Sequence, residues 1–303
     1  EGSILSNGQK FWKRAQTVIP GGTMLFSKNP DLFLPGKWPA YFSKSKGCKL
    51  WDLENNVFDD LAFMGVGTNI LGYCNPNVEK EVIKVVKNGT MSTLNSIEEI
   101  LLAEKLISLH PWSEMARFTR SGGEANSVAI RIARAASGRD KIAVCGYHGW
   151  HDWYLSSNID NENSLNSHLM KNLPIRGVPK NLKNTVFSFE YNNFEQLEKI
   201  VKKHKIGAIK MEVKRTSDPK NNFLKKIRNL ATKNNIVLIF DECTSGVRQA
   251  FGGLHKFYNV EPDLAIFGKA LGNGYAINAI IGRRSVMEHA NQSFISSTFW
   301  TER

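Results

Sequence analysis

Apolar residues recur along this chain in two alternating patterns, which together predict a parallel α/β sheet. Beyond about Val78, short apolar runs alternate with longer segments in which apolar positions recur at helical spacing. Short apolar runs are typical of strands covered on both faces, and strands that alternate with helices form parallel sheets. The expected strands are residues 116–119, 141–145, 185–189, 208–212, 237–240 and 264–267. The expected helices are residues 98–108, 124–137, 194–204 and 222–233.

A different pattern precedes this region. Residues 9–18 have the spacing of an amphipathic helix, which the Pro-Gly-Gly turn at 20–22 would end. Residues 47–59 contain two short alternating runs around an Asn-Asn pair, which predicts a strand pair outside the main sheet. We therefore expect an N-terminal segment over residues 1–60, followed by a large domain over residues 61–303.

Composition narrows the class to an ordinary globular protein. Of the 303 residues, 42% are hydrophobic and 22% are charged, which is typical of soluble domains. The sequence contains no apolar stretch of membrane-spanning length, and residues 1–20 lack the apolar core of a secretion signal. We therefore expect a cytoplasmic protein with no membrane partner. The four cysteines are scattered and form no CxxC pair, which disfavours a disulfide framework or a zinc site.

The net charge of +12 raises the question of a polyanionic partner. Many of the lysines stand in helix-like stretches such as residues 199–205 and 225–228, where a solvated helix face explains them. No aromatic residues alternate with these basic residues as in a single-strand binding surface. We therefore expect no nucleic-acid partner, and a non-catalytic basic binding module is the alternative hypothesis.

Lys269 ends a short apolar run and is followed by closely spaced glycines, within residues 265–275. Burial at such a position disfavours the charged form of a lysine and lowers its pKa. The neutral amine that results is the nucleophile that Schiff-base chemistry requires. For this segment alone, a surface lysine at the end of a strand is the simpler interpretation. Other segments of the chain are needed to choose between a reactive lysine and a solvated surface lysine.

Two segments offer groups that would bind a phosphorylated aromatic ring. Ser121, Gly122 and Gly123 stand where an expected strand passes into a helix, and free amides at a helix start favour a phosphate. A simple strand-to-helix turn is the alternative, and the glycines match neither GxGxxG nor the Walker pattern. Tyr147 or His148 could present a flat face to a planar ring. A structural aromatic cluster is the alternative there, and a metal site of His148, His151 and Asp152 is less favoured.

Asp241 and Glu242 end a buried apolar strand. A carboxylate at a sheet edge must be matched by a cation or a proton donor, and a protonated ring nitrogen is one such partner. An acid that caps the next turn or binds a metal is the alternative, and it fits Glu242 better than Asp241. With a phosphate cradle, a stacking aromatic residue and a strand-end lysine, Asp241 completes the set of groups that pyridoxal 5'-phosphate (PLP) requires.

In these segments and their order, the chain resembles the class III aminotransferases among the fold-type I PLP enzymes. It is most similar to the glutamate-1-semialdehyde aminomutase branch of that family. The resembling segments are residues 19–22 (IPGG), 121–125 (SGGEA), 131–134 (RIAR), 147–149 (YHG), 240–242 (FDE), 244–248 (TSGVR), 262–263 (PD) and 268–269 (GK).

The resemblance implies a mostly parallel sheet covered by helices, PLP as cofactor, and small amino and keto compounds as substrates. It also implies a homodimer with shared active sites and a C-terminal small domain that these residues lack. Lys269 would hold PLP as a Schiff base and act as general base, and Asp241 would pair with the ring nitrogen. The expected cofactor-binding residues are Ser121, Gly122, Gly123, Tyr147, His148, Glu212, Asp241, Thr244, Lys269 and, from the partner, Thr298.

Two departures from the aminomutase pattern leave the substrate open. Leu25 and Lys28 stand where the aminomutases have a serine and an arginine that contact substrate, and Glu212 is followed by residues 213–216 (VKRT) in place of a proline-containing turn. Glutamate semialdehyde, an amino sugar and other keto or aldehyde compounds are all compatible with the remaining residues. Transaminase and mutase outcomes both stay open, and an inactive fragment of such an enzyme is a further alternative.

Overall fold

The computed structural model describes residues 5–303, and the chain divides into two compact units. The first unit ends at Lys84 and the second runs from Val85 to Arg303. The boundary expected at residue 60 lies inside the first unit. Each unit is described by itself.

The first unit contains a helix and a small antiparallel sheet. Helix α1 (Asn7–Val18) begins at Ser6, whose side chain accepts a hydrogen bond from the amide of Gln9. Strands β1 (Phe42–Lys46), β2 (Lys49–Asp52) and β3 (Val57–Asp59) pair in that order. The predicted helix and strand pair are confirmed. Strand β1 was not expected, because its mostly polar, exposed residues lack an alternating apolar pattern. The helices α2 (Met64–Gly67) and α3 (Pro76–Asn88) follow.

The second unit is built on a seven-stranded sheet with the order β4-β10-β9-β8-β7-β5-β6. Strand β10 is antiparallel to both of its neighbours, and the other pairs are parallel. All six expected strands are confirmed, and β10 is the one that the sequence pattern did not predict. The strands are β4 (Met115–Thr119), β5 (Lys141–Cys145), β6 (Val186–Ser188), β7 (Ile206–Glu212), β8 (Val237–Glu242), β9 (Leu264–Phe267) and β10 (Asn278–Gly282).

Helices cover both faces of this sheet, and the four expected helices are confirmed. The α-helices are α4 (Ile97–Leu109), α5 (Gly122–Ser137), α6 (Asp152–Leu155), α7 (Phe194–Lys203), α8 (Phe223–Lys233), α9 (Leu254–Phe257) and α10 (Arg284–Met287). Short 3-10 helices lie at η1 (Phe26–Lys28), η2 (Pro30–Leu32), η3 (Ser156–Asn158), η4 (Lys180–Leu182), η5 (Lys269–Gly272), η6 (Glu288–Gln292) and η7 (Thr298–Thr301).

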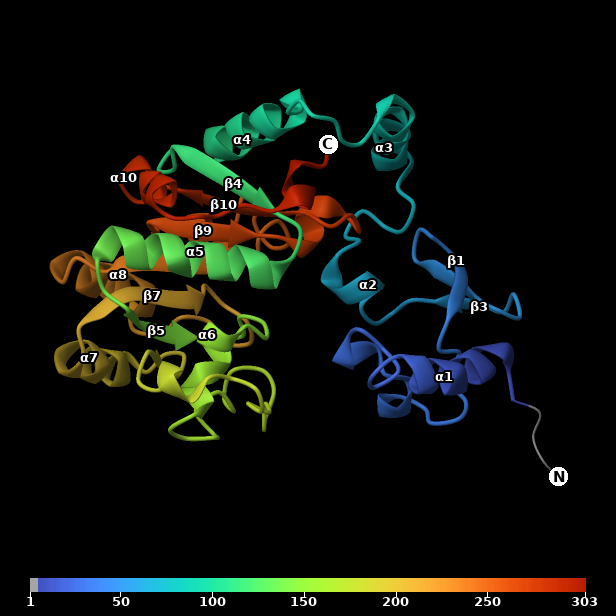
Figure 1. Cartoon of the computed structure of the whole chain (residues 1–303), viewed down its shortest axis with the longest axis horizontal. Helices are drawn as coiled ribbons and strands as arrows, with labels where there is room; N and C mark the ends of the chain where they lie inside the picture. The colour runs from blue at the N-terminus through green and yellow to red at the C-terminus, as the bar shows by residue number, and fades with distance from the viewer. Residues whose placement is uncertain (1–4) are drawn as a thin grey trace. The chain divides into compact units, whose positions relative to one another are not determined.

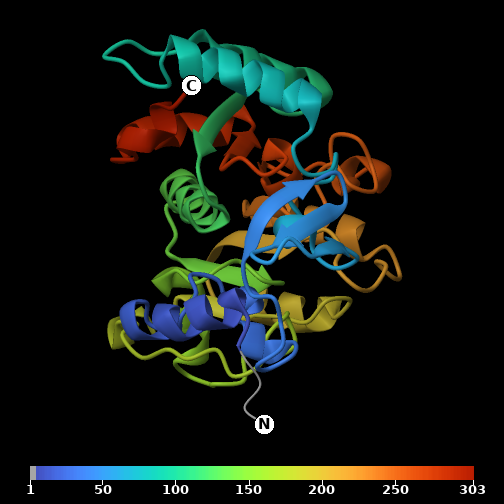
Figure 2. The same cartoon turned by 90° about the vertical axis from the view of Figure 1, so that its right-hand side faces the viewer.

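The two-residue period of the strands divides the core into layers. On β8, Ile239 packs with α5 in one hydrophobic cluster, whereas Phe240 packs with α7 and α8 in another. A third cluster joins Leu106 of α4 to Phe267 of β9. Figures 1 and 2 show α5 lying across one face of the sheet. The central strands are thus packed between helices on both faces of the sheet.

The register of the parallel strands brings their carboxyl ends together. Glu212 at the end of β7 lies opposite Asp241 of β8, and Asp241 lies opposite Ile266 of β9. Because β5 is parallel to β7, the residues that follow Cys145 emerge at the same edge. This is the edge where ligands bind in open α/β sheets.

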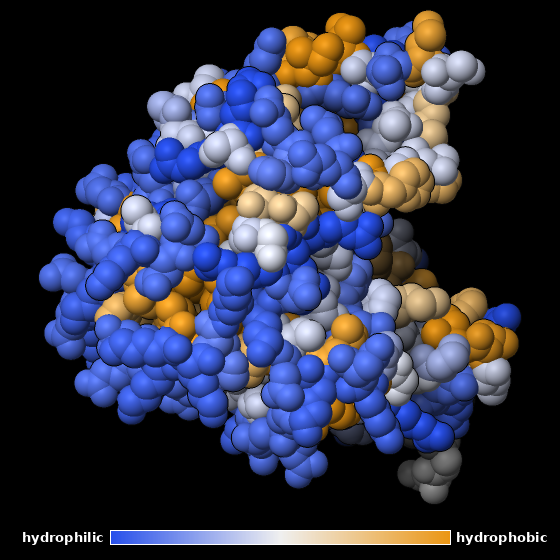
Figure 3. Space-filling model, turned by 60° about the vertical axis from the view of Figure 1, so that its left-hand side comes forward, coloured by the Kyte–Doolittle hydropathy of each residue, from blue (hydrophilic) through white to orange (hydrophobic). Residues whose placement is uncertain are grey.

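The surface bears out the interpretation of the charged helices. The lysines of α7 and α8 lie on the exposed sides of those helices, and the face seen in Figure 3 is largely hydrophilic. No helix within residues 5–303 combines the length and the apolar character needed to span a bilayer.

We predict that Leu197→Ala lowers the free energy of unfolding by about 2–5 kcal/mol, because it leaves a cavity where α7 packs on the sheet. Leu197 is fully buried, whereas Leu169 is 48% exposed. Leu169→Ala is therefore the matched control and should change stability by less than about 0.5 kcal/mol. Urea unfolding of both variants measures this, and equal losses would contradict the assignment of Leu197 to the core.

Candidate active site

Lys269 follows β9 and opens η5, and its backbone has a φ of 43°. The preceding residue has to be a glycine, because a Cβ on Gly268 would lie 2.1 Å from the side-chain nitrogen of Asn278. The Lys269 Nζ donates a hydrogen bond to the Thr244 hydroxyl at 3.0 Å. Burial, followed by the nearby Arg215 charge, lowers the pKa of Lys269. This is the direction expected for a lysine that ends a buried apolar run.

Asp241 lies buried at the end of β8, where three groups bind its carboxylate. Its Oδ2 contacts the Lys210 Nζ at 3.0 Å and the His148 Nδ1 at 2.9 Å, and its Oδ1 accepts the amide of Cys243 at 3.0 Å. Burial by itself would raise the pKa of Asp241, but the charge of Lys210 and the His148 contact outweigh it. The pKa of Asp241 is held well below its usual range, so the carboxylate is ionised.

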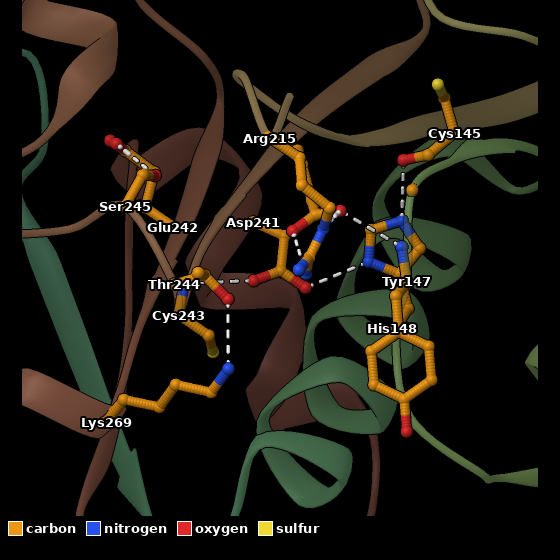
Figure 4. A network of polar contacts seen from close by, with 12 residues as sticks. Cys145, Tyr147, His148, Arg215, Asp241, Glu242, Cys243, Thr244, Ser245 and Lys269 are labelled. Atoms are coloured by element: carbon orange, nitrogen blue, oxygen red, sulfur yellow. Dashed lines mark hydrogen bonds and ion pairs between the residues drawn. The ribbon is translucent and has the colours of Figure 1, made fainter. Parts of the chain in front are cut away.

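His148 and Tyr147 follow β5 but occupy different environments. His148 is fully buried, and its Nε2 lies 2.9 Å from the carbonyl oxygen of Cys145. Burial and the Lys210 charge lower the pKa of His148. The ring of Tyr147 is only partly buried. In Figure 4, Lys269 and Tyr147 lie on opposite sides of Asp241. Of the two aromatic residues, Tyr147 is therefore the one that keeps some exposed surface.

Glu212 at the end of β7 forms a second ion pair at this edge. Its carboxylate binds Arg215 at two points, with distances of 2.6 Å and 2.9 Å, and accepts the amide of Tyr147 at 3.1 Å. The paired fork of hydrogen bonds fixes the guanidinium. Glu212 and Arg215 also line a small cleft together with His168 and Tyr191.

Helix α5 begins at the same edge with a capping box. The Ser121 hydroxyl accepts the Glu124 amide at 3.4 Å, and the Glu124 carboxylate accepts the Ser121 amide at 2.9 Å. The amides of Gly122 and Gly123 belong to the first turn, which has no preceding helical carbonyl to bond. A Cβ on Gly123 would lie 2.7 Å from the His151 Nε2, so only glycine leaves this ring undisturbed. The helix start thus presents amides that suit an anion.

The groups that surround Asp241 and Lys269 fit PLP. A carboxylate offers about four lone-pair positions, and three hydrogen bonds to Asp241 leave one for a ring nitrogen. The start of α5 can take a phosphate, and Lys269 supplies an amine of lowered pKa. The structure therefore brings together Lys269, Thr244, Asp241, His148, Tyr147 and Glu212, with Ser121, Gly122 and Gly123 at the adjoining helix start.

Thr298 is placed differently from the other expected residues. It opens η7 with an exposed side chain, and η7 is held through a 2.7 Å hydrogen bond from Arg120 Nε to the carbonyl of Phe299. Among residues 5–303, no recorded hydrogen bond or ion pair joins Thr298 to Lys269 or Asp241. Its expected role depends on a partner subunit.

The alternatives to a PLP site are less well supported by the geometry. Glu242 points away from Asp241 into the loop that follows β8, where it binds His255 and accepts the Leu254 amide and the Ser245 hydroxyl. It therefore has a structural role. Across the described part of the chain, no three His, Cys, Asp or Glu side chains come together to hold a metal ion. His151 binds Ser127 instead.

Sequence reasoning missed Lys210 and Arg215. Lys210 is the one lysine that is fully buried among the described residues, in the middle of the apolar strand β7. A cation inside an otherwise apolar central strand is the signal that could have found it, because such a charge needs a buried partner. Arg215 lies in the segment that departs from the family pattern, and its spacing from Glu212 is the one signal that could have indicated a contact.

Comparisons with known proteins agree with this geometry. The family model described as "Aminotransferase class-III" matches residues 35–302. A 3-aminobutyryl-CoA aminotransferase of Cloacimonas acidaminovorans is 34% identical over 98% of this chain and 69% of its own length. A glutamate-1-semialdehyde 2,1-aminomutase of Methanobrevibacter smithii is 33% identical over 91% of this chain and 64% of its own length. The chain thus spans about two thirds of the length of these relatives.

A solved structure shares the fold. The FumI protein of Sphingopyxis sp. MTA144, solved with PLP as an internal aldimine, superimposes with a TM-score of 0.82 at 23% sequence identity. The superposition covers 97% of this chain and 69% of that one. The predicted α/β fold of the PLP-dependent transferases is therefore confirmed.

We predict that Lys269 loses its proton below the ordinary lysine pKa of 10.5, because burial and Arg215 disfavour its charged form. The pH dependence of Lys269 acetylation in the cofactor-free chain, followed by peptide mass spectrometry, measures this. Arg215→Leu should raise the midpoint, since it removes one of the two causes. A midpoint at or above 10.5 in the unmodified chain would show the amine to be solvated.

The two glycines at the start of α5 should respond differently to alanine. Gly123→Ala is expected to cost about 1–3 kcal/mol of stability, because the new methyl group displaces the His151 ring. Gly122→Ala is the matched control, since its nearest neighbours would lie 3.8 Å away. It should be neutral or stabilising by roughly 0.5–1 kcal/mol, the helix preference of alanine. Thermal unfolding of both variants checks the difference, and equal effects would contradict the close approach at Gly123.

Proposed function

The chain belongs to the class-III aminotransferase family, whose members transfer amino groups with PLP, and from this we propose that it carries out such a transfer through Lys269. Its cofactor is PLP. The observation that carries the proposal is the placement of Lys269, a half-buried amine of lowered pKa at the end of β9. The ionised carboxylate of Asp241 ends the neighbouring strand.

Each expected residue would hold one part of the cofactor. The amides of Gly122 and Gly123 would bind the phosphate, the ring of Tyr147 would lie against the pyridine ring, and Asp241 would pair with the ring nitrogen. Lys269 would hold the aldehyde carbon as a Schiff base. When bound, PLP withdraws electrons from the substrate carbon that carries the amino group.

The chain's own residues would carry out and support the proton transfer. The Lys269 Nζ would accept the proton from the substrate carbon and return it as general base. The Thr244 hydroxyl, 3.0 Å from that nitrogen, orients its lone pair. Asp241 stays ionised because Lys210 and His148 bind it. The lowered pKa of Lys269 favours the neutral amine that this proton transfer needs.

A small amino compound and a keto or aldehyde compound are the proposed substrates. A small cleft lies beside Glu212 and Arg215, next to the proposed cofactor site. The two relatives named above act, by their names, on different compounds. Arg215 lies beside this cleft, so we expect the segment after Glu212 to influence the choice of substrate.

We also propose a cytoplasmic homodimer in which Thr298 of one subunit contacts the phosphate held by the other. The exposed apolar surface of the second unit supports the dimer. Leu94, Ile97 and Leu101 on and before α4 are exposed, as are Phe294 and Phe299 near the end of the chain. The two segments are joined by an ion pair of 2.8 Å between Arg303 and Glu98. Together they offer the kind of apolar patch that subunits cover.

We predict that borohydride reduction of the chain after incubation with PLP fixes the cofactor on Lys269, which peptide mass spectrometry will locate. Lys269→Ala should abolish this adduct and lower the rate of amino transfer by at least about 10²-fold, the usual contribution of a general base. Asp241→Asn should keep the adduct and lose activity, because the ring nitrogen loses its charged partner; the buried Lys210 loses its counter-charge in the same variant.

Lys256 supplies the control for this experiment, since it is a lysine near the surface that contacts the carbonyl of Leu109. Lys256→Ala should leave both the adduct and the activity unchanged. An adduct on another lysine would contradict the role of Lys269. Salt-sensitive nucleic-acid binding without any Schiff-base absorbance would favour the basic binding module instead.

A further inference from the structure

Lys210 forms a buried ion pair with Asp241, the carboxylate that the proposed chemistry places against the ring nitrogen. Its side chain is fully buried, and its Nζ lies 3.0 Å from Asp241 Oδ2 and 3.2 Å from His148 Nδ1. Within residues 5–303 it is the only lysine buried to this degree. Desolvating an ammonium is costly, and an apolar side chain of similar volume would avoid that cost. The contact with Asp241 therefore calls for a functional explanation.

The strand geometry places Lys210 deeper in the sheet than the ligand edge. Residues two apart on a strand face the same side, so Lys210 and Glu212 both project toward the face that α5 covers. Glu212 lies opposite Asp241. Lys210 lies opposite Ile239, two residues further from the carboxyl ends of the strands. Lys210 therefore reaches Asp241 from the interior, whereas a cofactor ring would approach from the strand ends.

The charges at this point nearly cancel before any cofactor is bound. Asp241 is ionised, and the Lys210 ammonium pairs with it at 3.0 Å, while burial and the Lys210 charge lower the pKa of His148. Both contacts from Lys210 and His148 are made to Oδ2, the same oxygen of the carboxylate. A ring nitrogen that pairs with Asp241 would meet a carboxylate whose negative charge is already largely compensated.

We propose that Lys210 is a positioning residue that weakens the hold of Asp241 on the protonated ring nitrogen of PLP. The inference rests on the proposed function, because it assumes that PLP binds with its ring nitrogen against Asp241. A ring that is less fully protonated withdraws electrons less strongly. The charge of Lys210 would in this way set how readily Lys269 removes the substrate proton, without touching the cofactor itself.

The test compares PLP with 1-deazapyridoxal phosphate, in which a carbon replaces the ring nitrogen. Equilibrium binding of both compounds to the full chain gives a ratio of dissociation constants that reports the Asp241 contact alone. Lys210→Met should raise the preference for PLP by about tenfold, a modest effect for removing one unit charge close to another. Lys210→Gln should act in the same direction, which covers the case in which the methionine variant does not fold.

Two further variants separate this role from a purely structural one. Lys210→Arg keeps the positive charge and should keep the original ratio. Lys214→Met is the matched control, since Lys214 pairs with the exposed Asp218 and should have no effect. In an Asp241→Asn background, Lys210→Met should no longer change the ratio. An unchanged ratio in both neutral variants of Lys210, with both compounds still bound, would overturn the inference and leave the proposed function intact. Failure of the full chain to bind either compound would overturn both.

Discussion

The buried carboxylate of Asp241 is the constraint on which the rest of the site depends. A carboxylate at this depth would take up a proton unless cations or donors surround it. Lys210 comes from β7, His148 from the segment after β5, and Asp241 from β8. Three neighbouring strands are therefore tied together at one charged point, and the parallel register that aligns their ends is what allows the contact. The sheet and the site share the same interactions.

Backbone conformation supplies the second part of the site. Lys269 takes a left-handed φ immediately after an extended Gly268, which turns its side chain back toward Thr244. Gly123 lets the start of α5 lie against the His151 ring. A side chain at either glycine would require its neighbours to move. Two tight connections therefore position these groups: the turn from β9 into η5 places the nucleophile, and the turn from β4 into α5 places the anion site.

The sequence was enough to predict the parts of this arrangement that depend on local pattern. Strands β5, β7, β8 and β9 are short and almost wholly buried, as their apolar runs indicated, and the family motifs located Lys269 and Asp241. Strand β10 was not predicted, because its place between β4 and β9 and its antiparallel direction depend on pairing with distant segments. Lys210 was not predicted for a related reason. A charged residue does not fit the apolar run around it, and its ion-pair partner Asp241 lies on another strand, which the local pattern does not show.

Charge pairing at the ligand edge explains why Lys269 is the amine that becomes reactive. Asp241 is matched by Lys210 at 3.0 Å, and Glu212 is matched by Arg215 at 2.6 Å. Each nearby carboxylate thus has its own cation. Lys269 hydrogen-bonds to the neutral hydroxyl of Thr244, and Arg215 adds a repulsive charge. If Lys210 were absent, Asp241 would act more strongly on Lys269 and favour its protonated form. The Lys210–Asp241 pair therefore affects the nucleophile as well as the carboxylate, because Lys210 offsets part of the charge by which Asp241 raises the pKa of Lys269.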